Sequence, residues 1–229
     1  MEELSEKDLR ETNFYVVYIL IDMRYTWPKF KLCRREGINL FGPAKYDVRK
    51  RRGVPWQHGW WNVRYSEYGK LLRNKQVLKR IYQLSEKTFK RIVMKRAWRY
   101  AKNKGIGHDK AVFHFLETRL DTVILRAGLA NTIMQARQIV THGHLLLNWR
   151  KHNIPSYQVT VNDKIEVKKK SKNSTLFADT PLVWWNHAIP SYLKVNKKDL
   201  SIEIVWAPSS EEVSVPVDIL KVIEFYARA

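Results

Sequence analysis

The stretch RLDTVILRAGLANTIMQARQIVTHGHLLLN, residues 119–148, contains the change of hydrophobic period that decides the fold class. As far as Gly143 its apolar residues recur every three or four positions, which predicts amphipathic helices. Thr132 opens a Ser/Thr-x-x-Gln capping box, so a short helix is expected between Thr132 and Gly143. From Leu145 onward the pattern is extended, which predicts strands. Residues 119–172 are therefore expected to form a compact helix–helix–strand unit of an α+β protein.

Helical periodicity also extends toward the N-terminus of this stretch. Asp109 to Arg126 predicts one helix with a single apolar face. Ser66 and Ser85 are expected to cap the N-termini of two earlier helices. In the capped helix described above, Ala136 is expected to face inward and Arg137 outward.

Three short strands are expected after the helices, because extended, apolar-rich runs separated by turn residues follow there. They are residues 145–148, 157–161 and 164–167. The whole chain divides into an extension of unknown role (1–28), a basic, mainly helical domain (29–118), the helix–helix–strand module (119–172) and a C-terminal part with short strands and a closing helix near 217–227 (173–229).

Positive charge is concentrated in one part of the chain. The 229 residues include 42 Lys and Arg against 22 Asp and Glu, a net charge of +20, and residues 24–110 alone hold 25 bases and five acids. A solvated surface mixes both signs, so this segment predicts a polyanionic partner. Nucleic acid is favoured, and an anionic membrane surface is the rival. Residues 24–65 lack a clear period and predict a loop-rich basic segment.

Composition excludes several classes of protein. A hydrophobic content of 45% is enough for a packed core, and a single Cys excludes a disulfide framework or a multi-thiolate zinc site. The longest apolar run, Phe14 to Ile21, is too short to cross a membrane. The sequence contains no Gly-rich phosphate loop, nucleophile elbow or His-Glu-x-x-His motif. Neither an enzyme nor a cofactor, metal or membrane partner is expected.

Several runs of residues together resemble a known family. Within the module they are Arg119–Leu129, Gln135–His144 and Asn153–Val159, and in the flanks they are Leu32–Gly37, Gln57–Gly59, Lys75–Tyr82 and Val222–Tyr226. The first set is similar to the RNA-binding module named after the bacterial-type small-subunit ribosomal protein S4. The second set resembles the remainder of that ribosomal protein family.

The resemblance implies a structural, non-enzymatic constituent of the small ribosomal subunit. Such a protein binds the small-subunit rRNA directly, nucleates assembly of its five-prime domain, and lies near the point where mRNA enters, where it affects decoding accuracy. The implied partners are this rRNA, neighbouring small-subunit proteins and mRNA, with one copy per ribosome. Nine Trp and the N-terminal extension point to an organellar or otherwise divergent ribosome. The expected location is either an organellar ribosome, mitochondrial rather than plastid, or the bacterial cytoplasm.

Two positions depart from the family pattern. Only Cys33 stands where some members carry four zinc-binding Cys, and one thiolate cannot complete a tetrahedral site, so no zinc is expected. Asn148-Trp149 replaces the usual Asn-Gly of a tight hairpin turn, so a looser or longer turn is expected.

Other interpretations compete at three features. An Arg-Leu-Asp tripeptide such as 119–121 carries the catalytic Asp in pseudouridine synthases, but residues 173–229 are too short for the catalytic domain of such an RNA-modifying enzyme. His142 and His144 could form a pair of metal ligands, yet no other ligand is near in sequence, so a role in contacting RNA or in supporting the loop is favoured. The aromatic residues among the bases can stack on nucleobases, although core packing is favoured for any single one.

The candidate RNA-binding residues are bases and His of the N-terminal half and the module. They are Arg34, Arg35, Lys45, Arg49, Lys50, Arg51, Arg52, His58, Arg64, Arg73, Lys75, Lys79, Arg80, Arg119, Arg126, Arg137, His142, His144, Lys168, Lys169 and Lys170. Because Arg137 is expected to face outward, its loss should weaken RNA binding without lowering the melting temperature.

Overall fold

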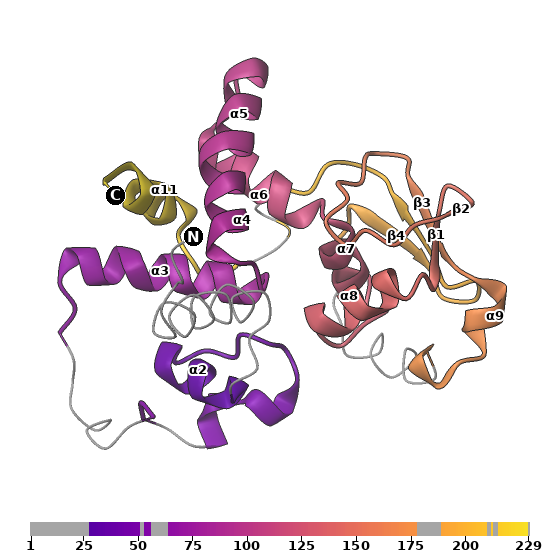
Figure 1. Cartoon of the computed structure of the whole chain (residues 1–229), viewed down its shortest axis with the longest axis horizontal. Coiled ribbons are helices and arrows are strands. Elements are labelled where there is room, and N and C mark those ends of the chain that lie inside the picture. The colour runs from indigo at the N-terminus through magenta and orange to yellow at the C-terminus, as the bar shows by residue number, and fades with distance from the viewer. Residues whose placement is uncertain are drawn as a thin grey trace, which may run out of the picture.

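The computed structural model describes residues 28–50, 53–55, 64–177, 189–209, 212 and 215–228, in a helical part and a helix–sheet part that lie side by side (Figure 1). The helical part contains α2 (Lys29–Glu36), α3 (Glu67–Ile81), α4 (Glu86–Arg91), the π-helical segment η3 (Ile92–Ala97), α5 (Trp98–Lys104), α6 (His108–Glu117) and α11 (Ile219–Arg228). The helix–sheet part contains α7 (Leu120–Arg126), α8 (Ile133–Thr141), β1 (Leu145–Leu147), β2 (Arg150–Lys151), β3 (Lys164–Val167), α9 (Lys169–Lys172), β4 (Leu193–Asn196) and β5 (Ser201–Ile204). The α+β class is confirmed.

Local capping signals begin the helices as the sequence predicts. The Ser66 hydroxyl accepts a hydrogen bond from the Gly69 amide at 3.2 Å, and the Ser85 hydroxyl accepts one from the Thr88 amide at 3.3 Å. Each bond satisfies an amide that the helix itself leaves unpaired. Helix α2 was not predicted, because residues 24–65 lack a clear period and were expected to be rich in loops. The helix ends at Gly37, whose φ of 74° is readily adopted by glycine.

The C-terminus returns to the helical part of the molecule. Helix α11 packs on α3, and its Val222 and Phe225 join a core with Leu78 and Phe89. The helix–sheet module is therefore inserted between the helices that begin and end the described chain.

A helical rod projects from the molecule. Helix α4, the π-helical segment η3 and α5 follow one another without a break, and the free end of α5 extends beyond the neighbouring helices (Figure 1). Buried Phe89, Val93 and Ala97 fasten the rod to the core. The left-handed backbone of Gly105 ends it, with a φ of 64°.

The single helix predicted over 109–126 is wrong, because the chain breaks at Arg119. Arg119 is extended (φ −68°, ψ 138°) and forms an isolated antiparallel bridge with Gln158. The Val159 amide donates to the Thr118 carbonyl, and the Leu120 amide donates to the Tyr157 carbonyl, both at 2.9 Å. Backbone groups from elsewhere in the chain thus replace the helical bonds, and the break separates the helical part from the module.

One antiparallel sheet, in the order β2-β1-β3-β5-β4, forms the rest of the module. The strands expected near 145–148 and 164–167 are confirmed as β1 and β3. The strand predicted over 157–161 is wrong, since these residues contribute only the bridge to Arg119. Strands from the C-terminal part complete the sheet, and Ile165 and Ile202 are fully buried within it.

The turn between β1 and β2 is tight, so the expectation of a looser or longer turn is wrong. Leu147 pairs with Arg150, which leaves only Asn148 and Trp149 between the strands, with φ of 47° and 64°. Two positive φ values characterise the type I′ hairpin turn. The Asn148 side chain clamps it, donating to Asp163 at 2.8 Å and accepting from the Lys164 amide at 3.0 Å.

None of the helices in the described part of the chain is both long and apolar enough to span a membrane.

Glu86, at the start of α4, connects three helices. Its carboxylate accepts hydrogen bonds from Lys75 at 2.8 Å, Lys79 at 2.9 Å and the Tyr226 hydroxyl at 2.7 Å. Partial burial on its own raises the pKa of Glu86, but the bonds from Lys75, Tyr226 and Lys79 outweigh burial and lower this pKa to about 2.

Acid should therefore weaken this junction. The folded-state pKa of Glu86 lies below its ordinary value of 4.5, so its stabilisation is complete above about pH 4.5 and is lost as the pH falls toward about 2. The free energy of unfolding, measured with urea across this pH range, should fall less steeply for Glu86→Gln than for wild type. If the free energy of unfolding falls equally with pH in the two proteins, the acid sensitivity comes from groups other than Glu86.

Candidate nucleic-acid interface

Seven of the candidate bases form ion pairs in which base and carboxylate are both buried or half-buried, and an eighth, the exposed Arg49, lies 3.7 Å from Asp47. On α3, Arg73 contacts Glu36 of α2 at 3.1 Å, and Arg80 contacts the same carboxylate. Lys75 and Lys79 contact Glu86, as described above. These pairs hold α2 and α4 against α3, so each base has a structural role.

The other three of the seven bases lie at the junction of the two parts. Arg126 binds Glu117 through two hydrogen bonds of 3.0 and 2.8 Å, and Arg119 binds Asp121 through two bonds of 3.0 Å. Glu117 and Asp121 are fully buried. Arg137 donates to Asp121 as well, at 2.7 Å.

Arg137 also reaches the helical part, so the expectation that it faces outward is wrong. Its guanidinium donates to the carbonyls of Gln83 at 2.7 Å and Tyr82 at 2.8 Å, just beyond the C-terminus of α3. A helix C-terminus leaves carbonyls unpaired and carries partial negative charge, which favours a cation there. Arg137 therefore ties α8 of the module to α3.

Arg137→Ala should destabilise the protein, in contrast to the expectation from sequence. The substitution leaves Asp121 with one cation fewer and two carbonyls without their donor, which is expected to lower the free energy of unfolding by about 1–3 kcal/mol. Chemical denaturation would measure the change. Arg137→Lys is the matched control, because it keeps the charge but lacks the planar fork whose three nitrogens each reach a different acceptor. An unchanged midpoint for Arg137→Ala would show that this link contributes nothing.

The remaining candidates lie at the surface or outside the described residues. Arg35, Lys45, Arg49, Arg64, His142, Lys169 and Lys170 are exposed, whereas Arg34, His144 and Lys168 are half-buried. Arg34 donates to the Gly53 carbonyl at 3.1 Å, and His144 Nδ1 lies 3.0 Å from the Ser171 hydroxyl. The structure does not describe Arg51, Arg52, His58 or the side chain of Lys50.

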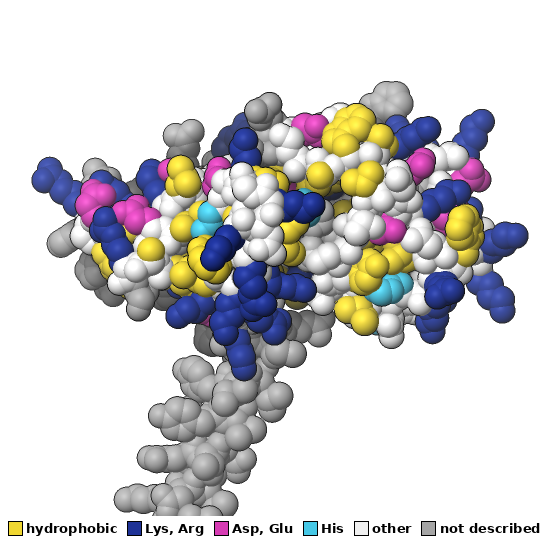
Figure 2. Space-filling model, turned by 90° about the horizontal axis from the view of Figure 1, so that it is seen from above, with side chains coloured by type: hydrophobic (Ala, Val, Ile, Leu, Met, Phe, Trp, Pro, Cys, Tyr) yellow, Lys and Arg dark blue, Asp and Glu magenta, His cyan; other side chains and the backbone are white. Residues whose placement is uncertain are grey.

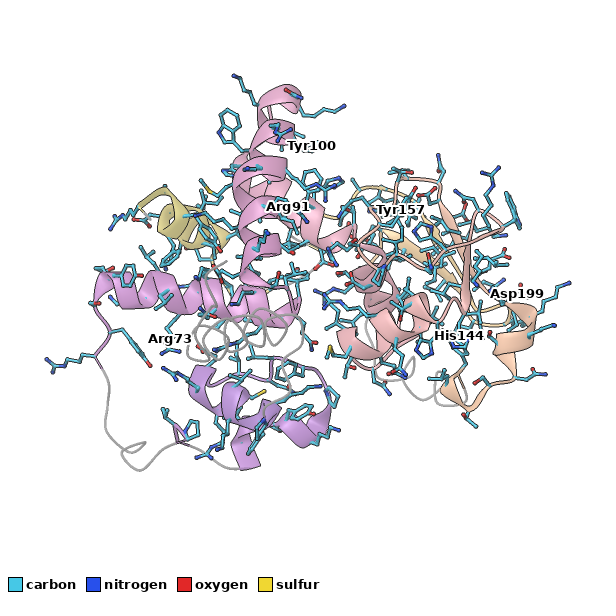
Figure 3. The ribbon with its side chains drawn as sticks, in the orientation of Figure 1. Arg73, Arg91, Tyr100, His144, Tyr157 and Asp199 are labelled. Carbon is cyan, nitrogen blue, oxygen red and sulfur yellow. The ribbon has the colours of Figure 1, made fainter. Side chains whose placement is uncertain are left out.

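Sequence reasoning missed the most uniform basic surface of the described protein. Lys87, Arg91, Lys95 and Arg99 recur every fourth residue along the rod, and all four are exposed. We call them the basic row. Within the described residues none of the four forms an ion pair with a carboxylate. Looking down on the end of α5, Figure 2 shows Lys and Arg side chains gathered on one side of the rod, and Figure 3 labels Arg91 upon it.

The π-helical segment reduces the drift of these four side chains around the rod. In an α-helix a step of four residues overshoots a full turn by about 40°, so an α-helical row would drift around the axis. A π-helix is wider, with bonds from residue i to i+5, and the same step falls short of a turn. Because η3 lies between α4 and α5, the two deviations oppose each other along the row. The strict four-residue spacing of these bases was the signal in the sequence that could have revealed the basic row.

Further bases and one aromatic side chain border the basic row. Lys90, Arg96, Lys102 and Lys104 are exposed, and residues 87–104 contain no acid at all. Trp98 is 52% exposed, with the Lys102 ammonium 5.5 Å from its ring centre. Tyr100 instead stacks on His114, with ring centres 5.2 Å apart. A track of cations without neutralising acids can contact successive phosphates, and an exposed indole can stack on a base.

Comparison with known proteins identifies the chain. A family described as "Ribosomal protein S4/S9 N-terminal domain" matches residues 24–117, and one described as "S4 domain" matches residues 118–165. The small ribosomal subunit protein uS4 of Kosmotoga olearia is 40% identical over 211 residues, and those of Thermotoga maritima and Clostridium tetani are each 39% identical over 212 and 214 residues. Each match covers 90% of this chain and 99% of the relative.

These relatives are bacterial ribosomal proteins, so they give no support to the expected preference for a mitochondrial ribosome. The identity extends across both the helical part and the module. The chain therefore belongs to the uS4 family, a family of structural, non-enzymatic proteins of the small ribosomal subunit.

Proposed function

We propose that this protein binds small-subunit rRNA directly and that the basic row supplies the main electrostatic contact. The observation that carries the proposal is the absence of any acid in residues 87–104, where eight Lys and Arg are exposed on one helical rod. Each phosphate neutralised by such a base releases bound counterions, which favours association. The exposed bases Arg35, Lys45, Arg64, Lys169 and Lys170 then extend the contact on either side.

The link through Arg137 supports binding of a folded RNA. Since Arg137 bonds to α3 and to Asp121 of the module, the two parts are held in one relative orientation. A rigid pair of basic surfaces can recognise the shape of an RNA junction without reading its bases. We propose accordingly that the protein binds the five-prime domain of the rRNA early and nucleates its assembly.

Membership of the family also supports a position among other ribosomal components. We propose that one copy lies against neighbouring small-subunit proteins, near the point where mRNA enters, and that it influences decoding accuracy. Residues 173–229 carry a net charge of −2, which suits contact with basic ribosomal proteins better than contact with RNA.

Direct and early binding can be tested with two components. The purified full chain should bind an isolated five-prime domain of small-subunit rRNA when no other ribosomal protein is present. A folded RNA of equal length and unrelated sequence is the control, and it should bind more weakly. Binding that requires other ribosomal proteins would contradict a nucleating role.

A further inference from the structure

Trp149 occupies a position that is unfavourable for its own side chain. It is 74% exposed, the most exposed large hydrophobic side chain in the described residues, and its φ is 64°. A left-handed backbone disfavours residues with a Cβ, and glycine is preferred in this turn. Leaving the indole exposed also gives up the hydrophobic stabilisation that its burial would provide. Within the described protein the Trp149 side chain forms no hydrogen bond, ring stacking or cation–π contact that would offset either cost.

The hairpin holds the backbone at Trp149 in one conformation. The Asn148 side chain is fixed by Asp163 and Lys164, as described above. The backbone amide of Asn148 also donates to the Lys164 carbonyl at 2.9 Å. On either side of the turn, Leu147 pairs with Arg150 in the β1–β2 ladder. Because the turn is already ordered, little backbone entropy is lost when a partner binds this side chain.

The surroundings of Trp149 are basic. Arg150 and Lys151 follow it and are exposed, and neither contacts a carboxylate in the described part of the chain. The Lys151 side chain lies over Gly143. A Cβ added to Gly143 would come within 2.6 Å of Lys151 Cε. The hairpin therefore borders the turn that carries His142 and His144. An exposed indole flanked by unpaired cations complements a nucleobase flanked by phosphates.

We propose that Trp149 stacks on an unpaired base of the small-subunit rRNA, with Arg150 and Lys151 on adjoining phosphates. This inference rests on the proposed rRNA binding and names a second, aromatic contact, far from the basic row in sequence. A contact between Trp149 and an apolar pocket of a neighbouring protein is the alternative that the test separates.

The test compares Trp149→Gly with Trp149→Tyr in the full chain, using the isolated five-prime domain rRNA as probe. Trp149→Gly should resist urea as well as wild type or better, since glycine suits the turn, yet bind the rRNA roughly tenfold more weakly. The slope of affinity against salt should stay unchanged, because stacking releases no counterions. Trp149→Tyr should retain most of the affinity. Trp206→Ala, which removes an exposed indole from the C-terminal part, should bind like wild type.

Distinct results would overturn the inference. If wild type binds the rRNA and Trp149→Gly binds it equally well, Trp149 does not stack on that rRNA. If rRNA affinity is unchanged but Trp149→Gly enters small subunits poorly, the partner is a protein and the RNA assignment is wrong. If wild type itself does not bind, the proposed function fails and this inference fails with it.

Discussion

Asp121→Ala is expected to reduce the free energy of unfolding by about 3–5 kcal/mol, the largest loss among the single substitutions considered. Asp121 is fully buried and accepts two bonds from Arg119, one from Arg137 and one from the Thr122 amide. Removing the carboxylate leaves two guanidinium groups without their anion, and Arg119 is itself almost completely buried. The link between module and helical part should loosen as well.

Equilibrium urea unfolding would measure this loss. Asp121→Asn keeps the shape but not the charge, so an intermediate value is expected. Asp199→Ala is the matched control, because Asp199 is exposed at the outer side of the sheet, as Figure 3 shows, and should change stability by less than about 0.5 kcal/mol. A loss below about 1 kcal/mol for Asp121→Ala would contradict the role given to this cluster.

Replacing all four residues of the basic row by Gln should weaken rRNA binding on the order of a hundredfold at moderate salt. The four side chains are exposed and make no ion pairs with described carboxylates, so the free energy of unfolding should change by no more than about 0.5 kcal/mol. Filter binding or fluorescence anisotropy with the five-prime domain rRNA would give the affinities, and circular dichroism the melting temperatures.

A matched control removes the same charge from the other end of the chain. Lys194, Lys197, Lys198 and Lys221 are exposed in the C-terminal part, and their replacement by Gln lowers the net charge by the same amount. This variant should lose much less affinity, because only long-range attraction is reduced. Equal losses in the two variants would mean that net charge, and not the basic row, governs binding.

Local signals in the sequence predicted local structure well. Ser66, Ser85 and Thr132 each accept the hydrogen bond expected of an N-cap, since that bond lies within four residues. The strands β1 and β3 followed from extended, apolar-rich runs separated by turn residues. The family resemblance indicated that the helical part and the module occur together in one known protein family. Hydrophobic periodicity alone does not indicate this.

Features that depend on distant residues were missed. The break at Arg119 requires backbone groups from residues 155–159, and the Arg137 guanidinium bonds to carbonyls more than fifty positions earlier. The tight turn at Asn148 depends on Asp163 across the sheet. For the same reason, seven bases that composition assigns to RNA contact proved to have buried or half-buried carboxylates as partners.

The salt dependence of rRNA binding tests the central claim most directly. If each residue of the basic row neutralises one phosphate, the slope of log affinity against log salt should be shallower for the four-Gln variant than for wild type by about 3 to 4. The C-terminal control variant should keep the wild-type slope. Equal slopes for wild type and the four-Gln variant would contradict the account, because the row would then contact no phosphate.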